Sequence, residues 1–328
     1  MTGRCPAELL TVLAIVALMP MVAAAQSMNA TEPSRTPWGA PDLQGVWDYR
    51  TITPLQRSPE FAGQEFLSEE QAAEFGRANS GTSLPTWSWW EDKLELTNDR
   101  RTALIVDPPD GRIPSLTPEA EARVAAMASV HRRPPEHPED RALFERCLVG
   151  RASGPPMIPS LLHYDSRVQV FQTPGYVVLF NEMIHETRVV PLDDGPHAPP
   201  AIRQWLGDSR GHWEGNTLVV ETTNFTDQTN YGGWGFGNPY YRVPLVGANM
   251  HLVERFTRVD ADTMAYEFTV DNPTTFSKPW SVAMPMRRTD DPLYEYACHE
   301  GNRGLPGILA ATRFEEAAAE PETPGSPP

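Results

Sequence analysis

The stretch MHLVERFTRVDADTMAYEFTV, residues 250–270, decides the fold because its two halves alternate apolar and polar residues around a short polar loop. If Asp260-Ala261-Asp262 is that loop, Val259 faces Thr263 across the turn. This register gives an apolar inner face and an opposite-charge pair outside. The pairs it predicts are Phe256 with Tyr266, Leu252 with Val270, and Arg255 with Glu267.

The same register places a carboxylate on the inner face. Glu254 lies opposite Phe268, whereas a slip of one residue would set Glu254 against Glu267, with like charges opposed. A buried carboxylate needs a partner or a raised pKa. Glu254 is therefore our first candidate for a catalytic residue.

Short strand-like runs separated by turn signals continue on both sides of this hairpin. No helix alternates with them, so a parallel α/β fold is disfavoured. We predict a mainly β protein: an antiparallel lipocalin-like barrel or a strongly curved meander sheet, in which PDLQGVW at 41–47 is a turn into the first strand. The other predicted strands are 167–173, 176–192, 212–213, 217–225, 250–259, 263–270, 279–288 and 293–299.

Two or three short peripheral helices are predicted in an insert at about 65–148. Ser68 and Gln71 form a capping box that starts a helix to about residue 77. Thr117-Pro118-Glu119 starts a second helix to about residue 131, with an N-cap, a proline and an acid in the first turn. A third helix is expected at 139–148.

The N-terminus predicts export. An apolar run at 9–25 ends in Ala23 and Ala25, an A-x-A cleavage signal. We therefore expect a periplasmic or secreted protein without membrane insertion after signal cleavage; a retained anchor is the alternative. The predicted organisation is a signal peptide at 1–25, a disordered linker at 26–36, a single β-rich domain at 37–314, and a disordered, acidic, Pro-rich tail at 315–328.

After cleavage two cysteines remain, Cys147 and Cys298. In an oxidising compartment such a pair is most simply a disulfide, and two buried thiols are the alternative. The chain carries 27 Lys and Arg against 43 Asp and Glu, a net charge of −16. This charge repels nucleic acid and anionic membranes, so the expected partner is a small-molecule ligand or substrate.

A histidine in the predicted strand 176–192 is the second catalytic candidate. Alternation places Asn181 and His185 on one face and Arg188 on the other. An imidazole inside a barrel can act as a general base, and a hydrogen-bonded structural histidine is the alternative. Asn181 and Arg188 are candidates for binding the substrate.

A third group lies in YEYACHEGN, residues 294–302, which ends a predicted strand and enters a loop. Ligand-contacting loops gather at barrel mouths. His299 and Glu300 are therefore catalytic candidates, Tyr294 and Asn302 substrate-binding candidates, and loop solvation is the alternative. His185, His299 and Glu300 could hold a metal, but no zinc-type spacing is present, so we predict no metal and no cofactor.

Two further motifs bear on the ligand. The glycine-rich loop at 231–241 contains Trp234, and an exposed aromatic there either covers a core or contacts a ligand. Contact with a ligand favours a sugar-like or aromatic substrate. The G-x-S-x-G string at 207–211 leads into a strand rather than a helix, so we interpret it as a turn and not as a nucleophile elbow.

Several strings together resemble a family of secreted bacterial proteins whose activity is uncharacterised. They cover nearly the whole mature chain: PDLQGVW at 41–47, ALIVDPPDGRIP at 103–114, EMIHETR at 182–188, GDSRGHWEGNTLVVETTNF at 207–225 and YEYACHEGN at 294–302. This resemblance implies no activity. Separately, Gly45-Val46-Trp47 is similar to the G-x-W of lipocalins, in which the tryptophan closes one barrel end, although the insert at 65–148 departs from a simple lipocalin.

Two classes of function follow. The first is a hydrolase or lyase for a small sugar-like or aromatic molecule, with proton transfer by His185 and Glu254 and orientation by Arg188 or His299. The alternative is a non-catalytic, lipocalin-like carrier for an apolar small molecule. A carrier needs a closed apolar lumen, whereas an enzyme needs titratable groups that converge on one pocket. The inner position of Glu254 favours the enzyme.

Overall fold

The hairpin at 250–270 has the predicted register in the structure, a computed structural model. Strand β8 (His251–Arg258) pairs with β9 (Thr263–Asp271), and Phe256 lies opposite Tyr266. The Val259 N–H donates to the Thr263 carbonyl at 2.9 Å, which closes the three-residue turn. Glu254 is opposite Phe268 on the inner face and is fully buried, so both predictions are confirmed.

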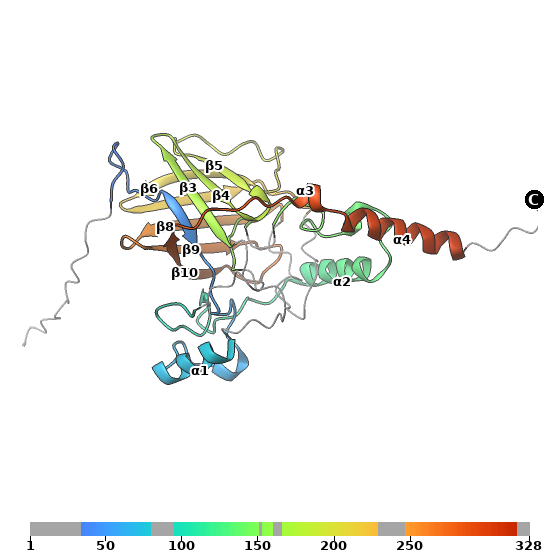
Figure 1. The fold of residues 1–328 in the computed structure, drawn as a ribbon, viewed down its shortest axis with the longest axis horizontal. Coiled ribbons are helices and arrows are strands. Elements are labelled where there is room, and N and C mark those ends of the chain that lie inside the picture. The colour runs from blue at the N-terminus through green and yellow to red at the C-terminus, as the bar shows by residue number, and fades with distance from the viewer. Residues whose placement is uncertain (1–33, 80–94, 151–152, 160–165, 229–246, 320–328) are drawn as a thin grey trace, which may run out of the picture. The chain divides into compact units, whose positions relative to one another are not determined.

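The structure describes residues 34–79, 95–150, 153–159, 166–228 and 247–319. Their strands form a nearly closed antiparallel barrel, so the predicted mainly β, lipocalin-like fold is confirmed (Figure 1). The order is β5-β4-β3-β1-β10-β9-β8-β7-β6, with β2 beside β10. The remaining strands are β1 (Gly45–Asp48), β2 (Ile105–Asp107), β3 (Arg167–Thr173), β4 (Tyr176–Asn181), β5 (Thr187–Pro191), β6 (Asp208–Glu214), β7 (Thr217–Thr223) and β10 (Trp280–Thr289).

The barrel wall has a seam between β5 and β6. Every neighbouring pair in the order above is antiparallel. Nine strands alternate in direction in this order. The two strands at its ends, β5 and β6, therefore run in the same direction. Strands that run in parallel need a long crossover connection, which here is residues 192–207. In the described strands no hydrogen-bonded ladder joins β5 to β6.

Large side chains fill the inside of the barrel. Trp47, Tyr266 and Trp280 have no exposed surface. Trp47 donates its indole N–H to the Leu43 carbonyl at 2.8 Å. Tyr266 contacts the ring of Phe256, with 4.9 Å between the ring centroids. The described residues therefore form a packed cluster of aromatic and aliphatic side chains inside the barrel.

Two helices begin where their sequences predict. In α1 (Glu69–Asn79) the Ser68 hydroxyl accepts from the Gln71 N–H at 3.1 Å, and the Gln71 side chain accepts from the Ser68 N–H at 2.9 Å. In α2 (Pro118–Arg132) the Thr117 hydroxyl accepts from the Ala120 N–H at 3.2 Å. Short 3-10 turns form at η1 (Pro59–Phe61), η2 (Pro138–Asp140) and η3 (Met183–His185).

The third helix, predicted at 139–148, is wrong. The chain forms η2, where the Asp140 carboxylate accepts from the N–H groups of Glu136 and His137, and continues in turns rather than a helix. Cys147 has a φ of 57°, which a right-handed helix does not allow. The predicted disulfide nevertheless forms: Cys147 bonds to Cys298, with their Cα atoms 5.8 Å apart.

The C-terminal predictions need two corrections. No strand forms at 293–299; an extended segment leads into α3 (Cys298–Gly301) instead. The tail predicted at 315–328 is wrong for residues 315–319, because α4 (Gly304–Ala319) continues through the helix-forming run EEAAA; residues 320–328 lie outside the described part of the chain. At the other end, Thr36 is buried and donates its N–H to the Ala40 carbonyl, so the ordered fold already includes part of the predicted linker.

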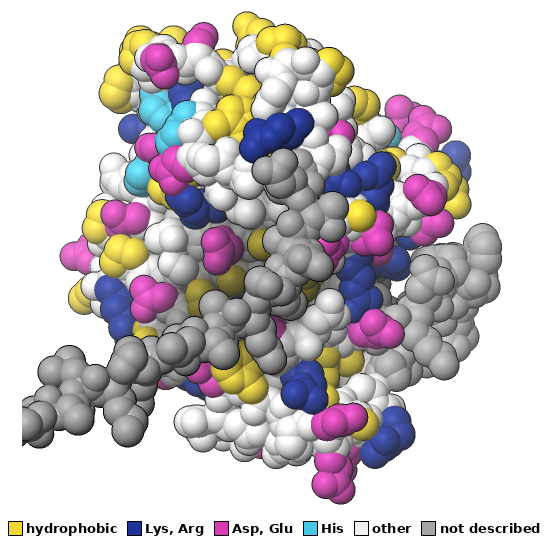
Figure 2. Space-filling model, turned by 90° about the vertical axis from the view of Figure 1, so that its left-hand side faces the viewer, with side chains coloured by type: hydrophobic (Ala, Val, Ile, Leu, Met, Phe, Trp, Pro, Cys, Tyr) yellow, Lys and Arg dark blue, Asp and Glu magenta, His cyan; other side chains and the backbone are white. Residues whose placement is uncertain are grey.

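Charged side chains cover the outer faces of β6, β7 and β8. Arg255 pairs with Glu214 at 2.7 Å, and His251 pairs with Glu221 at 3.2 Å. Figure 2 shows histidine side chains gathered beside acidic and basic side chains on part of the surface. Exposed pairs of this kind contribute about 0–1 kcal/mol each, so we assign them to solvation of the sheet. No helix among the described residues has the length and apolar character to cross a membrane.

Candidate functional site

The segment 176–192 forms a hairpin rather than one long strand. Strands β4 and β5 pair with each other, and the turn between them uses positive φ angles at Ile184 (57°) and His185 (54°). The turn shifts the alternation, so Arg188 points inward and His185 is exposed. The inner position predicted for His185 is therefore wrong. Its Nε2 accepts the Tyr296 N–H at 2.9 Å, and its ring stacks on Phe180.

Inside the barrel, Arg188 meets Glu254. The guanidinium donates from Nη1 to Oε2 at 2.5 Å and from Nη2 to Oε1 at 2.9 Å. The Tyr266 hydroxyl also donates to Glu254 Oε1, at 2.6 Å, and accepts the Met157 N–H at 3.1 Å. Burial alone would lower the pKa of Arg188, but the charge and hydrogen bonds of Glu254, together with Tyr266 and Glu186, outweigh burial and raise it. Burial and then the Glu254 charge hold the pKa of Tyr266 well above its usual value, so its hydroxyl stays a donor.

A second carboxyl group lies near the same guanidinium. Glu186 is buried; its Oε1 accepts the Gly150 N–H at 2.7 Å, and its Oε2 accepts the Ser153 hydroxyl. Burial raises the pKa of Glu186 to about 7, although Ser153, the Gly150 N–H and Arg188 all act to lower it. The inner wall therefore holds one arginine and two carboxyl groups, one of which binds a proton near neutral pH.

The seam opens into a cleft beside this network. At one end β5 and β6 are close: a side-chain carbon added at Gly211 would lie 2.8 Å from Val190 and 2.9 Å from Leu192. Outside this contact, Arg210 pairs with Asp193 at 2.8 Å. Where the strands separate, a cleft of about 640 Å³ lies between β5 and the segment that enters β6. Its lining residues are Leu148, Thr187, Arg188, Val189, Pro191 and the run Arg203–Ser209.

The two walls of the cleft carry different side chains. Arg188 lines the cleft, and its Nε is buried and makes no hydrogen bond. The opposite wall supplies a half-buried indole, Trp205, and an exposed guanidinium, Arg203. Arg203 donates from Nη1 to the carbonyls of Phe225 and Ala248, at 3.0 and 2.7 Å. The cleft therefore has a buried guanidinium in one wall and an aromatic ring in the other.

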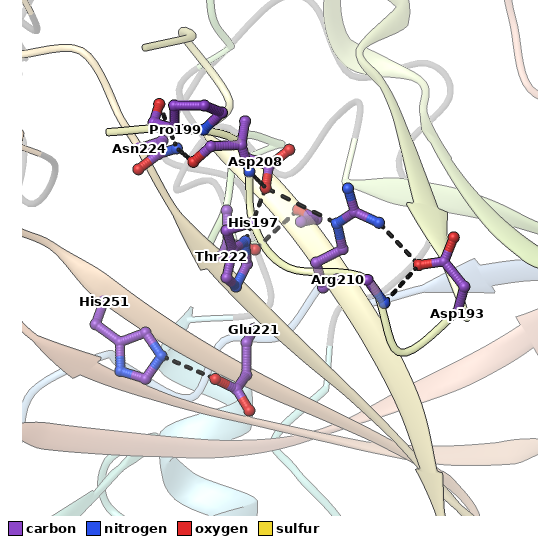
Figure 3. Close-up of polar contacts among 12 residues, drawn as sticks. Asp193, His197, Pro199, Asp208, Arg210, Glu221, Thr222, Asn224 and His251 are labelled. Atoms are coloured by element: carbon purple, nitrogen blue, oxygen red, sulfur yellow. Dashed lines mark hydrogen bonds and ion pairs between the residues drawn. The ribbon is translucent and has the colours of Figure 1, made fainter. Parts of the chain in front are cut away.

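A histidine–aspartate pair lies at the edge of the cleft (Figure 3). Asp208, which lines the cleft, accepts from His197 Nδ1 at 2.8 Å and from the Ala198 N–H at 3.0 Å. Figure 3 shows Arg210 between Asp208 and Asp193, with the His251–Glu221 pair apart from this group. A carboxylate bound at Nδ1 orients the ring and leaves Nε2 for proton transfer.

The other predicted site residues do not join the cleft lining. His299 and Glu300 are exposed in α3, and Tyr294 is exposed as well. Asn302 is half-buried, and its amide donates to the Glu145 carbonyl at 2.8 Å, a contact that anchors the loop. Trp234 lies outside the described residues.

The structure brings part of the 294–302 segment to the β4–β5 turn. The Tyr296 N–H reaches His185, and the Tyr294 N–H donates to Glu182 Oε1 at 3.0 Å. Asn181 is buried inside the barrel, where Tyr49 donates to its Oδ1 at 3.4 Å and its Nδ2 has no partner. Within the described ranges no cluster of three or more His, Cys, Asp or Glu side chains could hold a metal ion.

Sequence reasoning missed Glu186, His197 and Asp208 as site residues. His197 sits in a Pro-rich loop and Asp208 begins a strand, and no local spacing links them. Only the crossover that the parallel seam requires brings them together. Comparison of the chain with protein-family models, curated proteins and solved structures found no match. The function is therefore argued from this site alone.

Proposed function

We propose that this protein is a periplasmic or secreted hydrolase or lyase that acts on a small sugar-like or aromatic molecule in the seam cleft. The observation that carries the proposal is the His197–Asp208 pair beside a polar cleft. An oriented imidazole can take a proton from water or from a substrate carbon. Export fits the Cys147–Cys298 disulfide, which an oxidising compartment maintains.

The roles of the catalytic residues change accordingly. His197 takes the role of general base that His185 was expected to have. Glu254 is a poor proton acceptor because both of its oxygens already accept hydrogen bonds from Arg188 and Tyr266. Its role is to hold the guanidinium in place at the cleft wall. Trp205 offers a ring face on which a sugar or aromatic ring can stack.

The experiment is a turnover screen of the purified mature protein against glycosides, lactones, esters and small aromatic acids. On any substrate found, we expect His197→Gln and Asp208→Asn to lower kcat by about 10²–10⁴-fold, the range for a lost general base. His212→Gln is the matched control, since His212 also contacts a carboxylate, Glu214, but lies on the exposed outer face. Full activity of both dyad variants would refute the proposal.

A binding protein without catalysis is the second candidate. It is favoured by the Arg188–Glu254–Tyr266 network, in which the carboxylate is fully hydrogen-bonded, as in a rigid binding wall. Its ligand would occupy the cleft, because the described barrel interior is packed. Native mass spectrometry distinguishes the two: a ligand that co-purifies equally with wild type and His197→Gln, without turnover, indicates a binding protein.

A further inference from the structure

We infer that the seam cleft binds a short extended peptide, which pairs through its backbone with the free edge of β5. The inference rests on the proposed function for the location of the site. It narrows the aromatic substrate class to a peptide with an aromatic side chain and a free carboxyl end. The evidence is the hydrogen-bond register of β5, the lack of a paired neighbour in the described strands, and the lining of the cleft.

Two hydrogen bonds fix which residues of β5 are bonded to β4. The Asn181 N–H donates to the Glu186 carbonyl at 2.8 Å, and the Leu192 N–H donates to the Gly175 carbonyl at 2.9 Å. Both bonds continue the register of the β4–β5 ladder. In an antiparallel ladder, bonded and non-bonded pairs alternate. The even-numbered residues of β5 are therefore the ones that bond to β4.

The odd-numbered residues of β5 direct their backbone groups the other way. These residues are Thr187, Val189 and Pro191, and their carbonyls point away from β4, toward the seam. The N–H groups of Thr187 and Val189 point the same way. Pro191 has no N–H, which a strand tolerates only where no ladder needs that donor. The seam edge of β5 therefore carries a row of backbone donors and acceptors.

This row faces the cleft without a partner strand. Strand β5 ends the strand order, and in the described strands no ladder joins it to β6. All three odd-numbered residues line the cleft, and Thr187 and Val189 are exposed. An unpaired strand edge is a template for another chain. An extended peptide satisfies such an edge because its own N–H and C=O groups repeat at every second residue.

The cleft admits a single chain rather than the edge of another sheet. Its opposite wall is the run Arg203–Ser209, so the occupant is bounded on both sides. A second copy that offered its own β5 would bring the attached β4 with it. The volume of about 640 Å³ lies within the range of small-ligand sites, about 300–1,000 Å³. These limits favour a short peptide over a second subunit.

The lining indicates one side chain and one end of the peptide. Val189, Trp205 and Leu206 present apolar surface, and an aromatic side chain packs well against an indole. Arg203 is exposed, and its Nη1 donates to two neutral carbonyls, which hold the guanidinium without balancing its charge. A carboxylate is the complementary group for a guanidinium. The free carboxyl end of a short peptide supplies one.

The first experiment uses the mature wild-type protein and the peptide acetyl-Ala-Ala-Phe-Ala-Ala with a free carboxyl end. Amide hydrogen exchange is followed by NMR with and without saturating peptide. We expect exchange at Thr187 and Val189 to slow about tenfold or more, because peptide carbonyls accept these N–H groups. Unchanged exchange at both residues overturns the inference. So does a dimer in native mass spectrometry that protects them without peptide, since a second copy would then be the occupant.

An N-methyl scan of the peptide tests backbone pairing. Alternate residues of a strand bond to the same neighbour, so a methyl group removes a hydrogen bond only at every second position. We expect affinity to fall about tenfold at alternate positions and to change little between them. A uniform effect along the peptide overturns the inference.

Two peptide analogues test the side chain and the carboxyl end. Replacing the peptide phenylalanine by alanine should weaken binding about tenfold. A carboxamide end should weaken it about two- to fivefold, as for one exposed ion pair. Equal affinity of either analogue contradicts the ligand class as stated.

A matched pair of variants tests the protein side. Val189→Pro removes an N–H that points into the cleft, at an edge position where proline is tolerated, whereas Val189→Ala keeps this N–H. We expect about tenfold weaker binding for the proline variant and little change for the alanine variant. Equal effects of the two variants would overturn the inference. If the proline variant does not fold, the exchange measurement on wild type still decides.

The outcomes separate this inference from the proposed function. If the peptide leaves the β5 amides unprotected while His197→Gln abolishes turnover of another substrate, the peptide class is wrong and the enzyme stands. If the peptide binds with the alternating pattern while both dyad variants keep full activity, the peptide site stands and the catalytic assignment is wrong.

Discussion

Replacing Glu254 by Gln tests the central feature of the barrel interior. The substitution keeps the shape of the side chain but removes its charge, so Arg188, only 2% exposed, loses its counter-charge. Glutamine also replaces one carboxylate oxygen by an NH2 group. The Arg188 guanidinium and the Tyr266 hydroxyl both donate to Glu254, so a donor would then face a donor. Breaking one side of a buried ion pair costs about 3–5 kcal/mol. We expect Glu254→Gln to lower the free energy of unfolding by this amount.

The assay is urea unfolding followed by tryptophan fluorescence, in which a loss of this size lowers the midpoint by about 1–2 M. A double-mutant cycle isolates the pair. Arg188→Met alone should lower the free energy of unfolding by about 3–5 kcal/mol. The double variant Arg188→Met with Glu254→Leu should have a free energy of unfolding within about 2 kcal/mol of wild type, since replacing both partners of a buried ion pair by apolar residues is often neutral.

Two results would refute this reasoning. In the first, each single variant lowers the free energy of unfolding by less than about 1 kcal/mol, and the loss in the double variant equals the sum of the two. This would show that the charges of Arg188 and Glu254 are not coupled in the folded state. A Glu254→Gln protein that keeps its stability and loses all turnover would instead make Glu254 a catalytic residue, with its charge held at the expense of stability.

Three further predictions concern Glu186, the seam and the disulfide. The pKa of Glu186 is about 7 in the folded state against an ordinary value of 4.5, so the folded state holds the proton longer. The contribution of Glu186 to stability is then fully present below pH 4.5 and is lost as pH rises to 7, by up to about 3 kcal/mol. Glu186→Gln should flatten this dependence, and parallel urea-midpoint curves for the two proteins would contradict the assignment. Gly211→Ala should cost about 1–3 kcal/mol because its methyl group meets Val190 and Leu192, whereas Gly175→Ala, with open space around it, should change little; equal losses in thermal unfolding would argue against a tight seam. Replacing Cys147 and Cys298 by Ser should cost up to about 5 kcal/mol for a sequence separation of 151 residues; a wild-type Tm that reductant leaves unchanged would show that the bridge adds no stability.

The sequence predicted the fold where local pattern and packing agree. The register of the 250–270 hairpin follows from alternation and one charge pair, and the capping box at Ser68 is local chemistry. The hairpin at 176–192 was missed because its turn contains no Gly or Pro and instead places Ile184 and His185 at positive φ. Once the turn was missed, every residue after it was assigned to the wrong face. The inward position of Arg188 was lost in this way.

The candidate site was predictable only in part. Glu254 follows from strand register, so its burial could be deduced. Its partner, Arg188, comes from the opposite side of the barrel, and no pattern in either strand indicates the other. His197 meets Asp208 only because residues 192–207 cross between two strands of like direction. Contacts such as these form only when all the strands of the barrel have come together, so the spacing of residues within one segment of the sequence does not predict them.

The strand order also divides the wall into two half-shells, each continuous in sequence. One half-shell is β3 to β5 and the other is β6 to β10. On one side they are joined through β1, whose four residues pair with β3 and of which three also pair with β10. On the other side the described strands meet without a ladder. Because β1 joins the two half-shells by ladders on one side, a rotation of one half-shell about β1 would change the width of the cleft on the opposite side of the barrel.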